Sequence, residues 1–213
     1  YSSAASDVYK RQLLAAFGGA DAEEAENMRT YAPKSALILG RVVSMQDMAA
    51  LASSFPGVRA VQTEWRWDKN KQRASAHIFY IGDAGIRAAL SQRIRSVSDP
   101  STPITVETAL SRPLFISINV KINPRYLEAD VIKQLRETLT GAANGLLAPE
   151  NIGIGLPLYR SSIFENILNV AGTAAVQSVL ISENNFADFA IVPGTGFYFD
   201  IEHGSLIING KEN

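Results

Sequence analysis

Two blocks of the chain combine strand-like and helix-like patterns of hydrophobic residues. In the first block, apolar residues recur at helical spacing over 44–55 and 86–97. Ser44 and Asp47 have the spacing of a capping box and predict the start of the first helix. Alternation with a period of two predicts strands at 58–67 and 74–81, and a short strand follows at 104–107. This pattern predicts two helices packed on one face of a small sheet.

The second block begins near Pro113 and opens with the most regular alternation in the chain. Apolar residues occupy every second position over 114–122, as in a strand with one buried face. An amphipathic helix at 125–140, a second helix that ends at Gly172 and a strand at 174–181 follow. The block therefore predicts a second sandwich of the same kind.

The tail of the chain carries a different pattern. Two short apolar segments, Phe197–Ile201 and Ser205–Ile208, are separated by the turn-like residues Glu202–Gly204. This arrangement predicts a C-terminal β-hairpin that packs on the second block.

Together these elements predict an α+β fold of two small tandem α/β sandwiches, with mostly antiparallel sheets and helices on one face. The first sandwich spans 44–112 and the second spans 113–182, and a C-terminal β extension covers 183–213. We expect a connector helix over 13–43. Residues 1–12 begin with Tyr and resemble a translated adapter sequence, so we interpret them as a non-native leader.

Composition narrows the possible functions. The chain has 213 residues, 20 Lys and Arg against 21 Asp and Glu, and no cysteine. Without cysteine there are no disulfides, no thiolate metal sites and no Cys nucleophile. A charge near zero argues against a broad nucleic-acid or anionic-membrane surface, and no apolar run approaches the roughly 20 residues of a membrane helix.

Residues that could carry out chemistry are few. His77 falls within a predicted strand and His203 in a predicted turn, where a structural role is the simpler explanation. The sequence has no Gly-x-Ser-x-Gly motif, no histidine cluster and no complete phosphate-binding glycine motif. We therefore expect no catalytic residue, no cofactor and no metal. An enzyme would have to assemble its site from distant segments.

Four aromatic residues are the candidates for a binding surface. Trp65 and Trp67 share one side of a predicted strand, and Phe197 and Tyr198 lie in the predicted hairpin. Large aromatic side chains anchor protein interfaces, although internal packing explains them equally well. Stacking of the Trp pair on a base or a sugar is a third possibility. We predict contact with other protein subunits.

A longer pattern extends over most of the chain from about residue 20. An acidic helix is followed by three motifs: Ala-Pro-Lys-Ser-Ala-Leu at 32–37, Gly-Arg-Val-Val-Ser-Met-Gln-Asp-Met-Ala-Ala-Leu-Ala at 40–52 and Pro-Gly-Val at 56–58. The second block adds the alternating strand, Asn123-Pro124, an amphipathic helix and Gly-Leu-Pro-Leu-Tyr-Arg at 155–160. This order resembles the baseplate J-like family of contractile phage tails, which includes P2-type J proteins and T4-like wedge proteins. Met48 stands where the family often has Tyr or Phe.

The resemblance implies a wedge-type structural subunit of a tail baseplate. Its partners would be other baseplate proteins and copies of itself, without nucleic acid and without membrane insertion. Its location would be the virion tail, after assembly in the host cytoplasm. The family's N-terminal portion has no counterpart here, which implies a C-terminal fragment. The competing hypothesis is a tandem α/β module that binds a regulatory ligand between its sandwiches.

Overall fold

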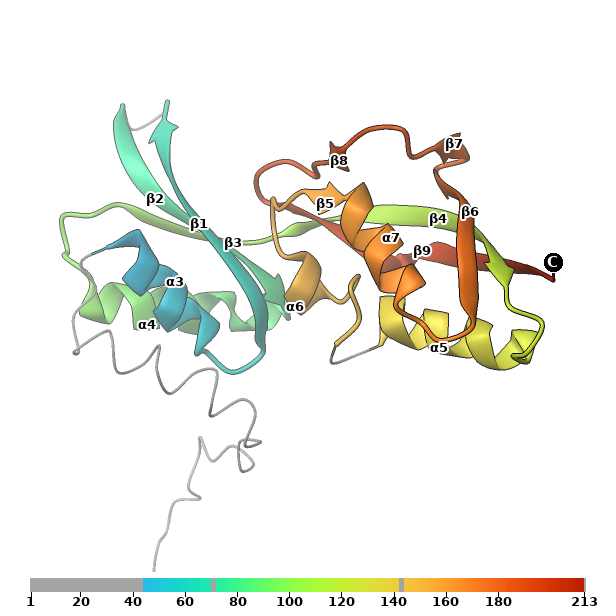
Figure 1. The fold of residues 1–213 in the computed structure, drawn as a ribbon. Helices are drawn as coiled ribbons and strands as arrows, with labels where there is room; N and C mark the ends of the chain where they lie inside the picture. The colour runs from blue at the N-terminus through green and yellow to red at the C-terminus, as the bar shows by residue number, and fades with distance from the viewer. Residues whose placement is uncertain (1–43, 70–71, 142–143, 213) are drawn as a thin grey trace, which may run out of the picture.

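The computed structural model describes residues 44–69, 72–141 and 144–212. The predicted leader at 1–12 and connector helix at 13–43 lie outside these residues. Two units, each a sheet with helices on one face, lie end to end in an elongated molecule (Figure 1). This confirms the predicted α+β class.

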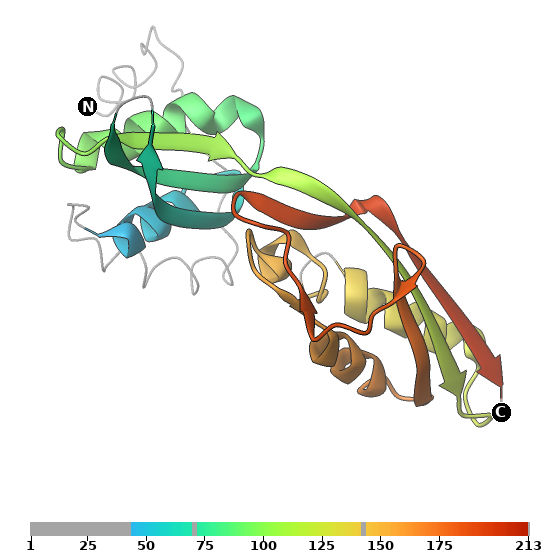
Figure 2. The same cartoon turned by 90° about the horizontal axis from the view of Figure 1, so that it is seen from above.

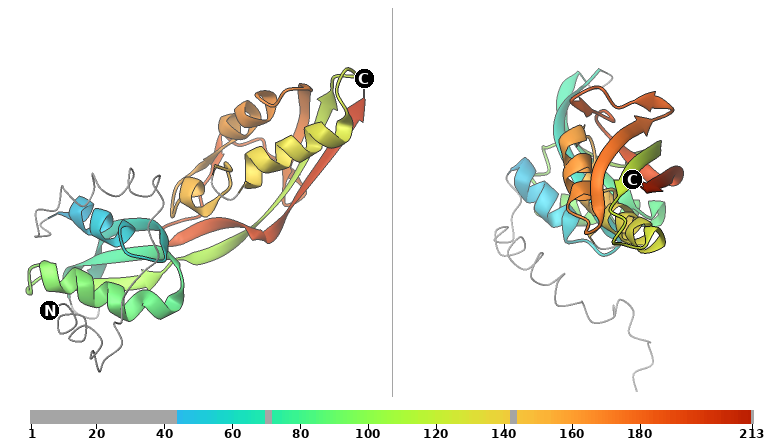
Figure 3. Two further views of the ribbon diagram at one scale, coloured as in Figure 1. Left: turned by 90° about the horizontal axis from the view of Figure 1, so that it is seen from below. Right: turned by 45° about the vertical axis from the view of Figure 1, so that its right-hand side comes forward.

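The first unit contains a three-stranded sheet of order β1-β2-β3. Its elements are α3 (Met45–Ser53), β1 (Val58–Asp68), β2 (Arg73–Gly82), a 3-10 turn (Ala84–Ile86), α4 (Arg87–Val97) and β3 (Ile104–Thr108). β1 and β2 pair antiparallel, whereas β2 and β3 pair parallel. Both helices cover the same face of the sheet (Figure 3).

The start of α3 follows from the predicted capping residues. The Ser44 hydroxyl accepts the Asp47 amide at 3.1 Å, and the Asp47 carboxylate accepts the Ser44 amide at 2.8 Å. This reciprocal pair satisfies amides that have no partner within the helix. Below the helices, the predicted alternation of β2 is confirmed, since Ala76, Ile78 and Tyr80 are fully buried against α3 and α4.

The second unit contains a four-stranded sheet of order β7-β6-β4-β9 and a small β5-β8 pair. Its strands are β4 (Leu110–Ile122), β5 (Leu158–Tyr159), β6 (Thr173–Ile181), β7 (Asn184–Asn185), β8 (Ala190–Ile191) and β9 (Phe197–Glu212). Its helices are α5 (Glu128–Thr140), α6 (Pro149–Ile152) and α7 (Arg160–Leu168).

The core of the second unit lies between β4 and the helices. The inward residues of β4 are nearly inaccessible to solvent: Leu114, Ile116, Ile118, Val120 and Ile122. The apolar stripes of α5 and α7 pack against them, including Leu135 and Ile167. The alternation seen in the sequence therefore marks the buried face correctly.

The predicted C-terminal hairpin is wrong. β9 is one strand that runs parallel to β4 along its whole length, with an irregular step between the pairs Pro113–Asp200 and Phe115–Ser205. At this step the buried Asp200 carboxylate accepts the amides of Glu202 and His203, at 2.9 and 3.3 Å. These bonds satisfy the turn-like residues locally, so the chain bulges and continues in the same direction.

The two units share a continuous ribbon of strands. β3 lies in the first sheet and β4 in the second, with only Ala109 between them. The first part of β9 runs beside the start of β4 and reaches the first unit (Figure 2). Two neighbouring strands therefore cross from one unit to the other.

The bulge in β9 yields a stability prediction. A Cβ at Gly204 would overlap the backbone carbonyl oxygen of Leu114, and backbone atoms cannot move aside cheaply. We expect Gly204→Ala to lower the free energy of unfolding by at least about 2 kcal/mol in denaturant titrations. Gly85→Ala is the control, because the nearest atom to its Cβ lies 3.4 Å away. Equal stability of the two variants would contradict this account of the bulge.

Candidate functional site

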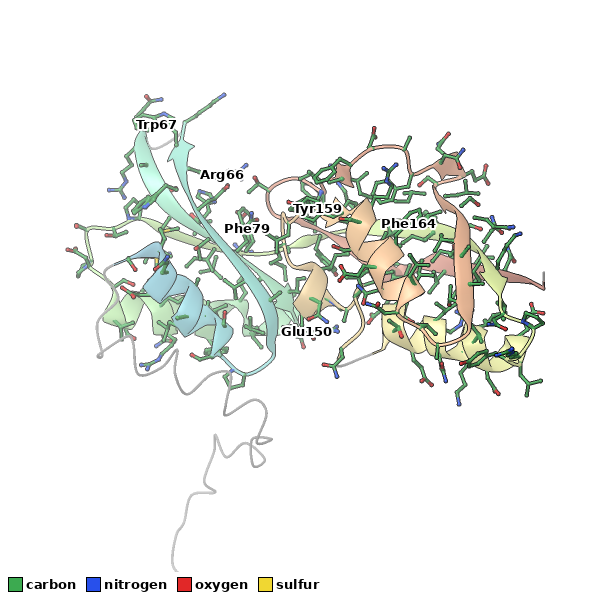
Figure 4. All side chains as sticks on the ribbon, in the orientation of Figure 1. Arg66, Trp67, Phe79, Glu150, Tyr159 and Phe164 are labelled. Atoms are coloured by element: carbon green, nitrogen blue, oxygen red, sulfur yellow. The ribbon has the colours of Figure 1, made fainter. Side chains whose placement is uncertain are left out.

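The hairpin tip, formed by Trp65, Trp67 and the strand ends around them, is the first candidate surface. Trp65 is 55% exposed and Trp67 is 60% exposed, so the two predicted residues lie on the surface. Their cross-strand partners are Ala76 and Ala74, which leave the indole rings uncrowded. The tip projects beyond the helical layer (Figure 4).

The exposure of the Trp pair has a simple cause in the length of the strands. Thr63 precedes Trp65 on the same face of β1, and its hydroxyl donates to the Met45 carbonyl oxygen at 3.3 Å. Met45 is the first residue of α3, so the helical cover ends beside Thr63. The next residues on that face, Trp65 and Trp67, extend past the start of the helix.

The opposite face of the hairpin points toward the second unit. Arg66 pairs with Glu64 at 2.9 Å, and its guanidinium lies over the Phe79 ring, 5.7 Å from the ring centroid. Figure 4 shows Arg66 and Phe79 on the side of the hairpin that faces the second unit. The tip therefore presents an indole face on one side and a charged face on the other.

The junction between the units is a small apolar cluster of its own. Phe79 and Ile81 from β2 pack against Ile154 of the second unit, with Tyr198 of β9 alongside. Phe197 is half-buried next to this cluster, and the Arg112 guanidinium lies 4.7 Å from the centroid of its ring. The candidates Phe197 and Tyr198 thus contact this chain itself, and their contact with other subunits stays a prediction.

Gln62 is a junction residue that the sequence did not reveal. Its side-chain oxygen accepts the Gly196 amide at 3.0 Å, and its amide group also abuts Gly155. Gly196 has a φ of +75°, and a Cβ there would press into the Phe79 ring. A polar residue on the outer side of a strand gives no signal of such a contact, because its partner lies 134 positions away.

Charged side chains also connect the two units at the junction. The Arg59 guanidinium bonds to the Glu150 carboxylate at 2.7 Å and approaches Glu202 at 3.9 Å. The hydrogen bond that Arg59 donates to the Glu150 carboxylate is the main cause that raises the pKa of Arg59. Burial, followed by the charge of Asp200, raises the pKa of Tyr198 above its usual value of 10.0. These side chains come from β1, α6 and β9, so the ionic contacts also join the two units.

Each histidine contacts a side chain of its own unit. The His77 ring stacks beside Phe79 at 6.1 Å, and its Nδ1 atom is buried without a hydrogen bond. The His203 Nδ1 atom lies 2.6 Å from the Asp200 carboxylate, which also holds the bulge of β9. No cluster of three potential metal ligands occurs within 44–69, 72–141 and 144–212. In that same part of the chain, no helix is both long and apolar enough to cross a bilayer.

The open face of the second sheet is the remaining candidate surface. The helices lie on the other side of this sheet, and Phe115, Leu180 and Ile207 line a shallow groove on the open side. Phe115 and Ile207 are each about half-exposed. A second hollow lies at the junction, between Arg59 of the first unit and Pro149 and Glu202 of the second. The hypothesis of a ligand-binding module predicts a binding site in this place.

Comparison with known proteins finds a family model that matches the first unit. Residues 40–107 match the model of the Baseplate J-like central domain. The matched segment runs from just before α3 into β3, so it covers the first unit almost completely. The resemblance to baseplate J-like proteins is therefore confirmed for this part of the chain. No curated protein matches the sequence.

A solved structure extends the likeness of the fold. The chain is similar to one chain in the six-fold-symmetrised cryo-EM structure of the anti-feeding prophage baseplate, with a TM-score of 0.50 and 13% sequence identity. The match covers 90% of this chain and 43% of the other chain. At this identity it shows a shared fold across both units, and the chain spans less than half the length of that relative.

The hydrogen bond between Gln62 and Gly196 predicts how much the junction contributes to the free energy of unfolding. Gln62→Ala removes the acceptor of the Gly196 amide, and an amide left without a partner costs about 1 to 3 kcal/mol. We expect that loss in the free energy of unfolding, measured by urea titration. Glu64→Ala is the control on the same strand face, and we expect a change within about 0.5 kcal/mol. A larger loss for Glu64→Ala than for Gln62→Ala would contradict the prediction.

Alkaline pH should lower the free energy of unfolding, because Tyr198 loses its proton. Because burial raises its pKa from 10.0, the folded state favours the neutral phenol. The stability that the neutral Tyr198 phenol contributes is complete below about pH 10. It is lost as the pH rises through the pKa that Tyr198 has in the folded state. Tyr198→Phe should therefore lose less stability than the wild type between about pH 8 and about pH 11. Burial also raises the pKa of Tyr80, so the variant should reduce the loss without abolishing it.

The control is Tyr126→Phe, because Tyr126 is 47% exposed. This variant should follow the wild type across the same pH range. If Tyr198→Phe also followed the wild type, the junction phenol would have no part in the alkaline loss of stability.

Proposed function

We propose that this chain is a wedge-type structural subunit of a contractile-tail baseplate and that it acts by adhesion to neighbouring subunits. The match of residues 40–107 with the Baseplate J-like central domain carries this proposal. The fold shared with a chain of the anti-feeding prophage baseplate supports it for the second unit. The chain spans 43% of that relative, and we propose that it is the C-terminal fragment of a longer protein.

The geometry suits a part that holds its neighbours at fixed positions. Two crossing strands, an apolar cluster and the Arg59–Glu150 ion pair join the units. Several independent contacts across one junction resist both bending and twisting. A baseplate component needs this rigidity, because it must hold its neighbours in a repeating arrangement.

We further propose that the chain has no enzymatic activity and needs no cofactor. His77 stacks beside Phe79, and Asp200, which lies next to His203, accepts two backbone amides of its own strand. Its partners are other baseplate proteins, and its place is the virion tail after assembly in the host cytoplasm. Neither nucleic acid nor a membrane is part of this proposal.

The hairpin tip is the proposed contact with a neighbouring subunit. Trp65 and Trp67 lie side by side on a projecting element, as anchor residues do when they enter a partner's pocket. If a partner buried these two half-exposed indole rings, a large apolar area would be removed from contact with water.

Incorporation into tail particles tests both the function and the tip. We expect mass spectrometry to find the chain in intact tails, and the Trp65→Ala/Trp67→Ala variant to be incorporated at least about tenfold less. Its free energy of unfolding should change little, because both rings are exposed. Phe189→Ala, which removes a 73% exposed aromatic side chain elsewhere, is the matched control.

The two possible failures differ. Absence of the wild-type chain from intact tails would refute the proposed function itself. Normal incorporation of the double variant would refute only the role of the tip.

A further inference from the structure

The outer edge of β9 is a second surface, and it differs from the edges of β1, β3 and β6 in the part of the chain that the structure describes. From Ser205 to Glu212, β9 pairs with Phe115–Ile122 of β4 in unbroken register. β9 is the last strand of its sheet in the described part of the chain, so its other edge has no strand beside it.

The hydrogen bonds show which backbone groups face outward on this edge. The Ser182 amide donates to the Phe115 carbonyl, so Phe115 faces β6 and the next residue, Ile116, faces β9. Ile116 stands opposite Leu206 in the parallel register, which means that it bonds to the two neighbours of Leu206. Leu206, and by alternation Ile208 and Gly210, therefore direct their amides and carbonyls away from β4.

The corresponding edge of β3 is protected by side chains. Arg87 and Arg95 of α4 donate to the carbonyl oxygens of Val106 and Ile104, at 2.8 and 3.2 Å. Charged side chains that occupy the outward carbonyls of an edge strand prevent pairing with another chain.

The other edges are interrupted or charged. β6 has irregular steps opposite Asn119–Val120 and Lys121–Ile122, and its neighbour β7 has only two residues. β1 starts with an irregular step and carries charges at Arg59, Glu64 and Arg66. Bulges, short edge strands and charges all discourage edge pairing.

β9 has no such feature between Gly204 and Gly210. The segment Gly-Ser-Leu-Ile-Ile-Asn-Gly contains no charge and no proline. On its outer edge, Arg136 donates a long hydrogen bond of 3.4 Å to the Leu206 carbonyl. The Asn209 side chain donates at 3.0 Å to the Asn119 side chain of β4, which lies on the other side of β9. An uncharged, aliphatic edge of this kind pairs readily with a further strand.

The helix beside this edge carries opposite charges at two matching positions. Arg136 of α5 lies next to Leu206, and the Glu128 carboxylate lies next to Gly210. An antiparallel copy of β9 centred on Ile208 would place Gly210 opposite Leu206. Glu128 of the second copy would then face Arg136 of the first, and the two-fold symmetry would repeat the pair.

We propose that two copies of this chain pair through the outer edges of their β9 strands, antiparallel and centred on Ile208. Leu206, Ile208 and Gly210 exchange backbone hydrogen bonds with Gly210, Ile208 and Leu206 of the second copy. The two sheets become one continuous sheet, and Arg136 exchanges its long bond for an ion pair with Glu128. This inference rests on β9 and α5 and does not depend on the proposed baseplate role.

Facing residues on the open side of the sheet provide the decisive test. In this register Ile207 stands opposite Asn209 of the second copy, in a pair without backbone hydrogen bonds, where side chains approach most closely. I207K/N209K therefore places lysine against lysine twice. I207K/N209E places lysine against glutamate twice and is the matched control. Both side chains are exposed, so both variants should fold. Both also lose the 3.0 Å bond from Asn209 to Asn119, so they remain matched in this respect.

We expect sedimentation velocity at about 1 to 100 µM to show a monomer–dimer equilibrium for the wild type, as a small interface requires. The dimer dissociation constant of I207K/N209K should exceed that of I207K/N209E by at least about tenfold. A wild-type chain that is monomeric throughout, or equal constants for the two variants, overturns the proposal. A dimer with equal constants would mean that association uses another surface.

A charge exchange on α5 tests the register independently. Arg136→Glu and Glu128→Arg should each weaken the dimer several-fold, because each leaves like charges face to face. The combined variant R136E/E128R restores opposite charges and should recover most of the wild-type affinity. Failure of the combined variant to recover affinity would contradict the centre at Ile208.

Discussion

The parallel pairing of β9 with β4 is the interaction on which the rest of the structure depends. It supplies one wall of the second core, and through Leu206 and Ile208 it packs against the helices. It also carries Tyr198 into the junction, where the phenol ring lies against the apolar cluster of the first unit. Without β9, β4 would lose its neighbour on one side, and the junction would lose one of its two crossing strands.

The bulge at Asp200 lets one strand serve both purposes. Before the bulge β9 runs beside the start of β4 near the first unit, and after it β9 forms the edge of the second sheet. A carboxylate that is only 5% exposed is costly to bury unless its oxygens accept hydrogen bonds. The amides of Glu202 and His203 provide those bonds, so the irregular segment is stabilised within β9 itself.

Local patterns in the sequence predicted the elements that depend on local physics. The alternation over 114–122 marked the buried face of β4, and Ser44 with Asp47 marked the start of α3. Pairing across long separations could not be predicted in this way. The turn residues Glu202–Gly204 suggested a hairpin because sequence patterns cannot show that Leu114 passes close enough to require a glycine there. The contact of Gln62 with Gly196 was invisible for the same reason.

In the candidate site, too, local sequence patterns predicted some features, and others depend on long-range contacts. Alternation placed Trp65 and Trp67 on one face of β1, but their exposure depends on where α3 begins, which the contact of Thr63 with Met45 fixes. Phe197 and Tyr198 were equally large and aromatic, yet they lie half-buried at the junction. Residue type selected four large aromatic side chains, whereas only the fold distinguishes one that faces solvent from one that joins two parts of the same chain.

The late position of β9 in the chain has a consequence for biosynthesis. A ribosome makes every other described element before it makes this strand, so one edge of β4 stays unpaired until Phe197–Glu212 have been made. Pairing over such long separations is slow, and exposed strand edges during that interval favour association with other nascent chains. Chains cut short before Phe197 would keep that edge open permanently and would be natural substrates for chaperones or proteases.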